Sequence, residues 1–373
     1  MRAFVILSFM SLATMLHAKT LVYFGGYARG PEAGIHVSTF DVETGALGAP
    51  QDAANMSQAG FLAIHPDGRH LYAVGERERG VVRAFEIDRS SGKLETLNDR
   101  SSGGPGPCHV SLDRDGRHVF SANYTGASVS AIRIREDGAL GAQTARMTYE
   151  GSSVHPTRQT KSFAHSANLD PSGRFLIVAD LGSDRILVHR FDAETGALEP
   201  NDPAFAAVAP GSGPRHFAFH PGGAHGYVVN ELSNTVTVFD WDAAAGVLAE
   251  KQTLSTLPAG FEEQTTSAEI VVHPNGRFLY TSNRGHDSIA IFSIDAATGK
   301  LTAIGHEPSG GDTPRNFALA PGGRWMLVAN QASDSIIVFA VDGEQGALRR
   351  HGPSIPVPNP TCVRFLTIEA SSP

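Results

Sequence analysis

Three side chains suited to acid–base and charge-stabilising chemistry stand at irregular places in this sequence: His165, Arg215 and Glu231. A histidine has an ordinary pKa close to neutrality, so it can accept a proton from water at physiological pH. A glutamate can orient such a histidine, and an arginine can stabilise negative charge that develops on an oxygen. These residue types suit acid–base chemistry and the stabilisation of negative charge, provided that the fold brings them together.

Six further polar residues are candidates for binding a substrate: Asn123, His216, Glu269, Asn283, Arg284 and Arg315. Arg215 and His216 stand together in "GPRHFAFHPGG", directly before a short apolar run that ends in a turn. Two cationic groups at the start of a strand suggest that this end of the strand faces a ligand. Arg284 and Arg315 can hold a carboxylate or a phosphate through paired donors.

The elements that position these residues follow an internal repeat. Turn segments such as "HPDGRHLYAVGE" from His65, "DPSGRFLIVADL" from Asp170 and "HPNGRFLYTSNR" from His273 recur about fifty residues apart. A second turn, such as "SGKL" at Gly92 or "TGKL" at Gly299, follows 22 to 24 residues after the glycine of the first. Strand-length runs of β-branched and aromatic residues lie between the turns, so each repeat unit is interpreted as four short strands.

Seven such units predict an all-β fold, a seven-bladed β-propeller of four-stranded antiparallel blades. A single four-stranded sheet cannot bury both of its apolar faces, and a closed ring protects the edges of the array. The first unit lacks its innermost strand, and the C-terminal "NPTCVRFLTI" can supply it. We therefore expect residues 361–368 to close the ring beside residues 21–27, within one propeller domain over residues 19–373.

Matching the units predicts which candidates share one rim of the ring. Adjacent strands run antiparallel, so the start of each first strand lies beside the end of each second strand. Most candidates fall in irregular rows there, which the repeat alone does not explain. Asn or Asp recurs in the row of Asn123 and Asn283, however, and His65, His220 and His273 recur in the turns, which favours structural roles. Solvation in a wet channel is the alternative interpretation of the cluster.

The composition argues against several classes of partner and site. The formal net charge is −8 and no basic run occurs, so we expect no binding to nucleic acid or to a membrane surface. No HExxH, CxxC or calcium-loop motif and no serine-nucleophile motif is present, so we expect neither a metal nor another cofactor. Cys108 and Cys362 belong to units that are not neighbours, and we interpret both as packed thiols.

The first eighteen residues, "MRAFVILSFMSLATMLHA", have the pattern of a signal peptide. A basic residue precedes an apolar stretch, and the small residue Ala18 precedes Lys19. The apolar stretch is short for a membrane-spanning helix, which needs roughly twenty residues. We therefore expect an exported chain, periplasmic or secreted, with no membrane contact after cleavage.

The segments "AHSANLDPSGRFLIVADLGSDRI", "GPRHFAFHPGG" with "VVNELSNTVTVF", and "AEIVVHPNGRFLYTSNRGHDSIAIF" resemble the seven-bladed lactonase family. That family contains the propeller-type 6-phosphogluconolactonases and the carboxy-muconate lactonizing enzymes. The resemblance covers nearly all of residues 20–368. It implies a metal-free lactonase site at the rim, with His165, Arg215 and Glu231 as its catalytic core and a small lactone as substrate. Many members carry a second histidine where this chain has Phe163.

The function predicted from this resemblance is hydrolysis of a sugar-type lactone. Export would favour an unphosphorylated aldonolactone, because 6-phosphogluconolactone belongs to cytoplasmic metabolism. Two alternatives remain, a lactonizing enzyme and a non-catalytic platform that binds a ligand or a protein. A narrow polar cleft at the rim favours lactone chemistry, whereas a broad aromatic surface favours a partner.

Overall fold

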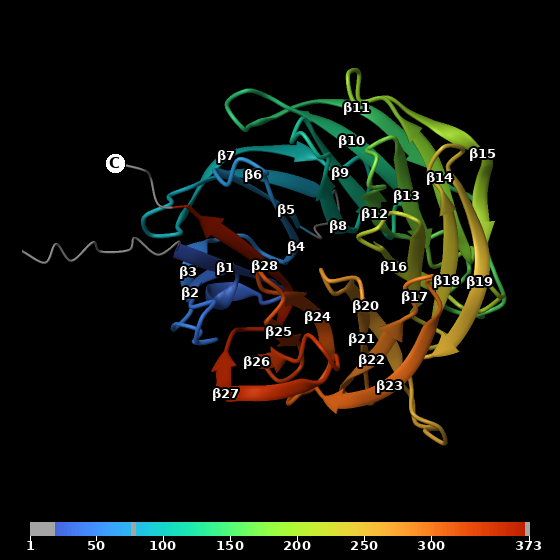
Figure 1. Ribbon diagram of the computed structural model, residues 1–373. Helices are drawn as coiled ribbons and strands as arrows, with labels where there is room; N and C mark the ends of the chain where they lie inside the picture. Colours follow the sequence, from blue (N-terminus) through green and yellow to red (C-terminus); the bar gives the residue numbers. More distant parts are fainter. Residues whose placement is uncertain (1–18, 76–79, 370–373) are drawn as a thin grey trace, which may run out of the picture.

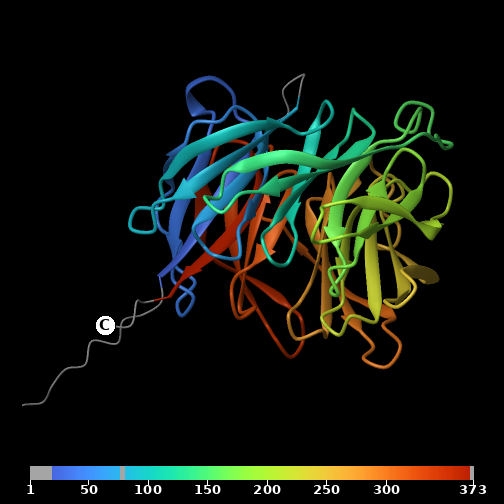
Figure 2. The ribbon, with the colours of Figure 1, turned by 90° about the horizontal axis from the view of Figure 1, so that it is seen from above.

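The computed structural model describes residues 19–75 and 80–369. Seven four-stranded antiparallel sheets stand around a common axis (Figure 1) and form a single disc when the ring is seen from its edge (Figure 2). The predicted seven-bladed propeller is confirmed. The predicted signal peptide, residues 1–18, lies outside the described residues. Within the described part of the chain, no helix has the length and apolar character needed to cross a membrane.

Each blade is one sheet, and its four strands follow one another from the innermost to the outermost in the order given below. Blade 1 consists of β28 (Pro360–Ile368), β1 (Lys19–Gly26), β2 (Ile35–Phe40) and β3 (Gln51–Ala54), and a short 3-10 helix spans Gly30–Glu32. Blade 2 consists of β4 (Ala59–Ile64), β5 (His70–Gly75), β6 (Val81–Ile87) and β7 (Leu94–Ser101). Blade 3 consists of β8 (Pro107–Leu112), β9 (His118–Asn123), β10 (Ser128–Ile134) and β11 (Leu140–Thr148). Blade 4 consists of β12 (Ala164–Leu169), β13 (Phe175–Asp180), β14 (Arg185–Phe191) and β15 (Leu198–Ala207).

The remaining three blades complete the ring. Blade 5 consists of β16 (Pro214–Phe219), β17 (His225–Asn230), β18 (Thr235–Asp242) and β19 (Val247–Ser255). Blade 6 consists of β20 (Thr266–Val272), β21 (Phe278–Arg284), β22 (Ser288–Ile294) and β23 (Leu301–Pro308). Blade 7 consists of β24 (Pro314–Leu319), β25 (Trp325–Asn330), β26 (Ser335–Val341) and β27 (Leu348–Pro356).

The core lies between neighbouring blades. The second strand of a blade, for example β13 with "FLIVAD", is buried along its whole length because a blade covers each of its two faces. The outermost strands, such as β7, expose most of their side chains. This gradient explains why the second strands read as continuous apolar runs, whereas the outer strands are largely polar.

The turn histidines join each blade to the next. His65, His220 and His273 each donate from Nε2 to a turn carbonyl of the following blade, those of Gly116, Gly276 and Gly323, at 2.8, 2.9 and 3.1 Å. Their Nδ1 atoms accept the backbone N–H two residues further on. Because all three histidines make the same two bonds, they recur in the repeat for a structural reason.

The second turn forms another link between blades. Gly138 has φ of +78°, and a Cβ at this position would lie 2.1 Å from the ring of His70 in the preceding blade. Tyr72 donates its hydroxyl to the Gly138 carbonyl at 2.8 Å. A glycine is therefore required in this turn both for its left-handed backbone and for the close approach of the ring.

The C-terminal strand closes the ring as predicted. In Figure 1, β28 lies beside β1, and the two pair antiparallel from Lys19 opposite Ile368 to Gly26 opposite Pro360. Blade 1 thus takes its innermost strand from the end of the chain and its other three strands from the beginning. This pairing covers edges that an open ring would leave exposed.

Candidate active site

A β-bulge near the start of the innermost strand positions the candidate residues. In β16 the pairing with β17 passes from Pro214 to His216, which leaves Arg215 as the extra residue. His165 in β12 and Arg315 in β24 occupy the same place in their blades. A bulge takes one residue out of the ladder and changes the direction of its side chain. The recurring bulge therefore brings the irregular row of residues to the channel.

Glu231, which directly follows β17, is the centre of a buried charge cluster. Its Oε2 accepts a hydrogen bond from Arg215 Nε at 3.0 Å and forms an ion pair with Arg284 Nη2, also at 3.0 Å. Its Oε1 accepts a hydrogen bond from Arg158 Nη2 at 2.5 Å. Burial raises the pKa of Glu231, but the charges of Arg284, Arg215 and Arg158 outweigh this effect and lower the pKa to about 2. The carboxylate is therefore ionised at neutral pH.

His165 lies beside this carboxylate, with its Nε2 4.0 Å from Glu231 Oε2. Burial holds the pKa of His165 well below its usual range, and the positive charges of Arg215 and Arg315 lower it further. The imidazole is therefore neutral near pH 7, and one of its two ring nitrogens carries a free lone pair. Cys108 Sγ lies 3.8 Å from the Nδ1 atom of His165.

Arg215 lies behind Glu231 and lines neither of the two channel cavities described below. Its side chain is buried, and Nη1 donates to the Ala268 carbonyl at 2.8 Å and to His216 Nε2 at 3.2 Å. Its Nε is engaged with Glu231. The guanidinium thus joins the Glu231 cluster to residues deeper in the channel.

A cavity of about 430 Å³ lies in front of His165 and Glu231. Three arginines, Arg158, Arg284 and Arg315, face the same space as the single carboxylate of Glu231. The guanidinium of Arg315 lies over the ring of Tyr27, 5.1 Å from its centroid. The other lining residues are Gly106, Cys108, Tyr124, Thr125 and Thr266. The lining therefore combines a neutral base with an excess of positive charge.

His216 and Glu269 do not share this cavity. They line a second cavity of about 400 Å³, whose walls include Val272 and Leu319 at the far ends of their strands. Since those strands start at the His165 end of the channel, the second cavity lies toward the opposite end. His216 Nδ1 donates to Glu269 Oε1 at 2.8 Å. The structure thus divides four of the six predicted binding residues between two spaces.

Asn123 and Asn283 belong to neither cavity. Asn123 donates to the Ser102 carbonyl at 2.9 Å and to Ser128 Oγ at 3.1 Å. Asn283 donates to the Thr256 carbonyl at 2.8 Å. Both side chains are fully buried and hold the loops next to their own strands. We therefore do not propose these two asparagines as substrate-binding residues.

The sequence did not single out Arg158 as a site residue. It lies between β11 and β12, in the segment of residues 149–163, which is longer than the equivalent connections between the other blades. Gln159 anchors this segment, because its Nε2 donates to the Leu181 carbonyl at 2.9 Å and to Asp184 Oδ1 at 2.8 Å. The length of this connection was the available signal, since long loops in a regular repeat often carry function.

The place of the second histidine found in many family members is occupied by an aromatic stack. The ring of Phe163 lies against that of Tyr124, with centroids 4.6 Å apart and planes 25° apart. Tyr124 also contacts the edge of His165 and lines the 430 Å³ cavity. Phe163 therefore backs an apolar part of the wall and supplies no second base.

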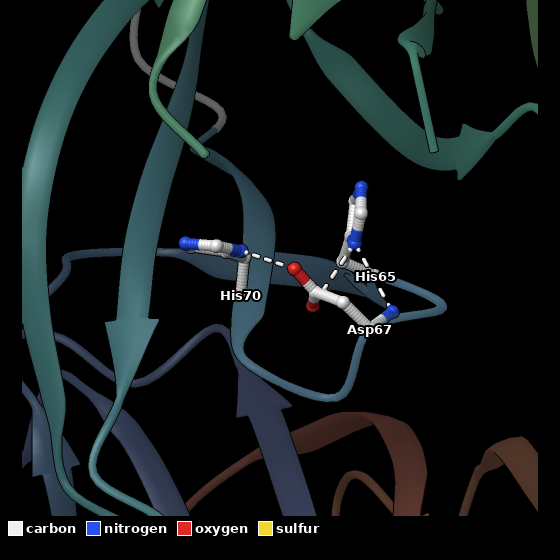
Figure 3. A group of neighbouring side chains, drawn as sticks. All are labelled: His65, Asp67 and His70. Carbon is white, nitrogen blue, oxygen red and sulfur yellow. Dashed lines mark hydrogen bonds and ion pairs between the residues drawn. The ribbon is translucent and has the colours of Figure 1, made fainter. Parts of the chain in front are cut away.

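Among the described residues, one group of three side chains has donor types that could hold a metal ion: His65, Asp67 and His70. Figure 3 shows them around one turn, with Asp67 between the two histidines. His70 Nδ1 donates to Asp67 Oδ2 at 2.8 Å, and both ring nitrogens of His65 are occupied by the turn bonds described above. His220 and His273, the equivalent histidines of blades 5 and 6, make the same bonds as His65. We therefore interpret this group as part of the turn structure.

Comparison with known proteins supports the resemblance stated above. Residues 21–365 match the family described as "Lactonase, 7-bladed beta-propeller". The chain is 34% identical to the 6-phosphogluconolactonase of Bacillus subtilis strain 168, over 93% of this chain and 99% of that protein. It is 36% identical to a 6-phosphogluconolactonase of Formosa agariphila, over 78% of this chain and 83% of the relative.

A solved structure gives the same result. The periplasmic gluconolactonase PpgL of Pseudomonas aeruginosa superposes with a TM-score of 0.89 at 35% identity, over 95% of this chain and 100% of that chain. The chain belongs to the seven-bladed β-propeller lactonase family.

Proposed function

We propose that this protein hydrolyses a sugar-type lactone, with His165 as general base. The observation that carries the proposal is the neutral imidazole of His165 facing a 430 Å³ cavity in which Glu231 is ionised and arginines surround it. A base that is unprotonated at neutral pH is ready to accept a proton from water. The family membership supports the same class of reaction.

The reaction consists of a proton transfer and an acyl transfer to water. His165 takes a proton from water as its oxygen adds to the lactone carbonyl, and the carbonyl oxygen becomes an oxyanion. Collapse of this intermediate breaks the ring C–O bond, and the proton returns from His165 to the leaving alkoxide, which gives a hydroxy acid. Glu231, 4.0 Å from His165 Nε2, stabilises the imidazolium formed in between.

The arginines differ in their access to the cavity, and we propose different roles for them. Arg284 and Arg315 line the cavity and are proposed to stabilise the oxyanion and to bind acidic groups of the substrate. Arg215 is 2% exposed and held by Glu231, Ala268 and His216. We propose that it contributes to catalysis by fixing the Glu231 carboxylate.

The charge of the cavity favours an acidic substrate. Three guanidinium groups and one carboxylate face the space, while the His165 imidazole is neutral. Arginine binds phosphate and carboxylate oxygens through paired donors. A phosphorylated aldonolactone is therefore the first candidate, in agreement with the names of the bacterial relatives.

An unphosphorylated aldonolactone is the second candidate. The similarity to a periplasmic gluconolactonase and the signal-type sequence of residues 1–18 favour it, as does the aromatic wall that Phe163 supports. Export is part of this candidate. Mass spectrometry of the native protein is expected to give a chain that begins near Lys19, and an intact Met1 on cytoplasmic protein would count against export.

A non-catalytic binding platform finds less support. Within the described residues, the exposed large hydrophobic side chains are Val154, Phe205 and Ile304, which lie in separate segments. Scattered single residues of this kind do not make an interaction patch. The polar cavity is the feature that calls for a ligand.

A hydrolysis screen tests the proposal and separates the two candidates. Purified protein is assayed with 6-phosphogluconolactone and with gluconolactone, and spontaneous ring opening is subtracted. We expect hydrolysis of at least one lactone that is lost in His165→Ala, with the phosphorylated compound preferred by kcat/KM. A preference for gluconolactone selects the second candidate. If neither lactone is hydrolysed above the rate of the His165→Ala variant, the proposal fails.

A further inference from the structure

A chain of hydrogen bonds runs from the ring-closing strand to the Glu231 cluster. The backbone N–H of Val363 in β28 donates to Asn316 Oδ1 at 2.9 Å, and Asn316 Nδ2 donates to Glu269 Oε2. Glu269 Oε1 accepts from His216 Nδ1 at 2.8 Å. His216 Nε2 then accepts from Arg215 Nη1 at 3.2 Å, and Arg215 Nε donates to Glu231.

The two ends of this chain determine the direction of every bond in it. A backbone N–H can only donate, so the oxygen of Asn316 must face Val363 and its amide nitrogen must face Glu269. Arginine can only donate, so His216 must present an unprotonated Nε2 to Arg215 and carry its proton on Nδ1. The Glu269 carboxylate accepts from both sides, and it also accepts from the backbone N–H of Ile270 at 3.0 Å.

The residues of this hydrogen-bond chain are buried, so a bond with the wrong direction would be costly. Asn316, Glu269, His216 and Arg215 are all buried and come from β24, β20 and β16, the innermost strands of three consecutive blades. In such surroundings, two donors placed face to face cost the full desolvation of a polar group. Glu269 and His216 stand on the far side of Arg215 from the 430 Å³ cavity and do not line it. Glu269 is joined to the Glu231 cluster through His216 and Arg215, and the ring of His216 also lies edge-on to that of His165, with centroids 5.3 Å apart.

We propose that Asn316, Glu269 and His216 are positioning residues that hold Arg215 against Glu231 by this one-way relay. The proposal rests on the proposed lactonase function for its kinetic readout only. Closure of the ring is thereby coupled to the active site, because the last innermost strand supplies the donor that orients the relay. In this proposal His216 and Glu269, which also line the 400 Å³ cavity, fix a side chain of the site.

A swap of the carboxylate and the amide tests the direction of the relay. In Glu269→Gln, the new amide nitrogen faces a donor wherever it points, either Asn316 Nδ2 or the N–H groups of His216 and Ile270. In Asn316→Asp, a carboxylate faces the Glu269 carboxylate. The double variant Glu269→Gln with Asn316→Asp restores all bonds, since the glutamine donates to the aspartate and still accepts from His216.

The expected result is a strong interaction between the two substitutions. Each single variant is expected to lower kcat at least about tenfold with little change in KM, and the double variant to recover to within about threefold of wild type. Asn201→Asp is the control, a buried amide that donates to the Ala245 and Gly246 carbonyls far from the site. It is expected to lower thermal stability without changing kcat of the folded protein.

A second readout does not depend on the reaction. The Nε–H of Arg215 is observed by ¹H–¹⁵N NMR and assigned by its absence in Arg215→Lys. We expect its exchange with water to become at least about tenfold faster in each single variant and to return toward wild type in the double variant. An unchanged exchange rate in Glu269→Gln, or single variants that the double variant does not rescue, would overturn the relay. If wild-type protein hydrolyses no lactone, the proposed function fails while this measurement still decides the relay.

Discussion

Arg215 and His216 are adjacent in β16 and share a hydrogen bond of 3.2 Å, yet only His216 lines a cavity. The β-bulge takes Arg215 out of the ladder and places it between the two spaces of the channel. On one side it contacts Glu231, and on the other it contacts His216. Because Arg215 lies between the two spaces and contacts both Glu231 and His216, its substitution is expected to affect both turnover and stability.

Changing Arg215 to alanine is expected to lower kcat by about a hundredfold or more, the scale seen when one preorganised charge-stabilising group is lost. Glu231 would keep Arg158 on its Oε1 and Arg284 on its Oε2 but lose one of the two guanidinium groups that hold Oε2. The folded state should also become less stable, because the arginine is a buried partner of a buried carboxylate. Steady-state kinetics on folded protein and a thermal melt measure the two effects.

The matched control for this variant is His220→Ala. His220 joins two blades through Gly276 and lies in a turn, away from the charge cluster. Its loss is expected to lower the melting temperature while leaving kcat of the folded fraction unchanged. Full turnover by Arg215→Ala would remove Arg215 from the catalytic unit.

Changing Arg158 to alanine is expected to raise KM for an acidic lactone by about tenfold, because a paired-donor contact to a substrate anion is lost. Its side chain is 39% exposed, so little stability should be lost. Initial-rate measurements over a range of substrate concentrations give KM. Arg190→Ala is the control, since this exposed arginine pairs with Glu199 on the outer strands of blade 4. An unchanged KM in Arg158→Ala would show that the segment 149–163 does not contact the substrate.

Acid is expected to destabilise the fold through its buried histidines. Burial lowers the pKa of His189 to about 4, below the value of 6.5 for an exposed histidine. The stability linked to this neutral histidine is fully present above about pH 6.5 and is lost as the pH falls through about 4. Burial also lowers the pKa values of His109, His165 and His216, so they act in the same direction.

His189→Gln isolates one part of this acid effect. Glutamine keeps an acceptor for the hydroxyl of Tyr149, which lies 2.8 Å from His189 Nε2, but it does not titrate. Between pH 7 and pH 4, the variant should lose about 2–3 kcal/mol less unfolding free energy than wild type. Urea unfolding at the two pH values measures the difference. Parallel losses in the two proteins would show that His189 is not protonated on unfolding in this range.

Removing residues 360–373 is expected to destabilise the whole protein. The truncation deletes β28, exposes the edge of β1 and removes the Val363 donor of the relay. A chain shortened only by residues 370–373 is the control and should melt like wild type. A thermal melt followed by circular dichroism distinguishes the two, and a truncation at residue 360 that keeps the wild-type melting temperature would contradict the role of β28 in closure.

The fold could be predicted from the sequence because its determinants are local and repeated. The turn glycines, of which Gly138 is one, need a left-handed backbone, and the runs between them have the period and composition of strands. The missing first strand of the first unit, together with a matching segment at the C-terminus, indicated how the ring closes. The same alignment of units placed His165, Arg215 and Glu231 at one rim, where the structure brings them together.

The direction of each side chain was decided only by the tertiary structure. The bulge at Arg215 depends on how two strands pair, and neither strand carries a local signal for it. His216 and Glu269 line a cavity separate from the one in front of His165, and Arg215 is buried behind Glu231 and lines neither. Arg158 entered the site from a connection outside the repeat, held there by Gln159. Repetition in the sequence determines which strand ends meet, whereas ladder register and loop anchoring determine which side chains meet.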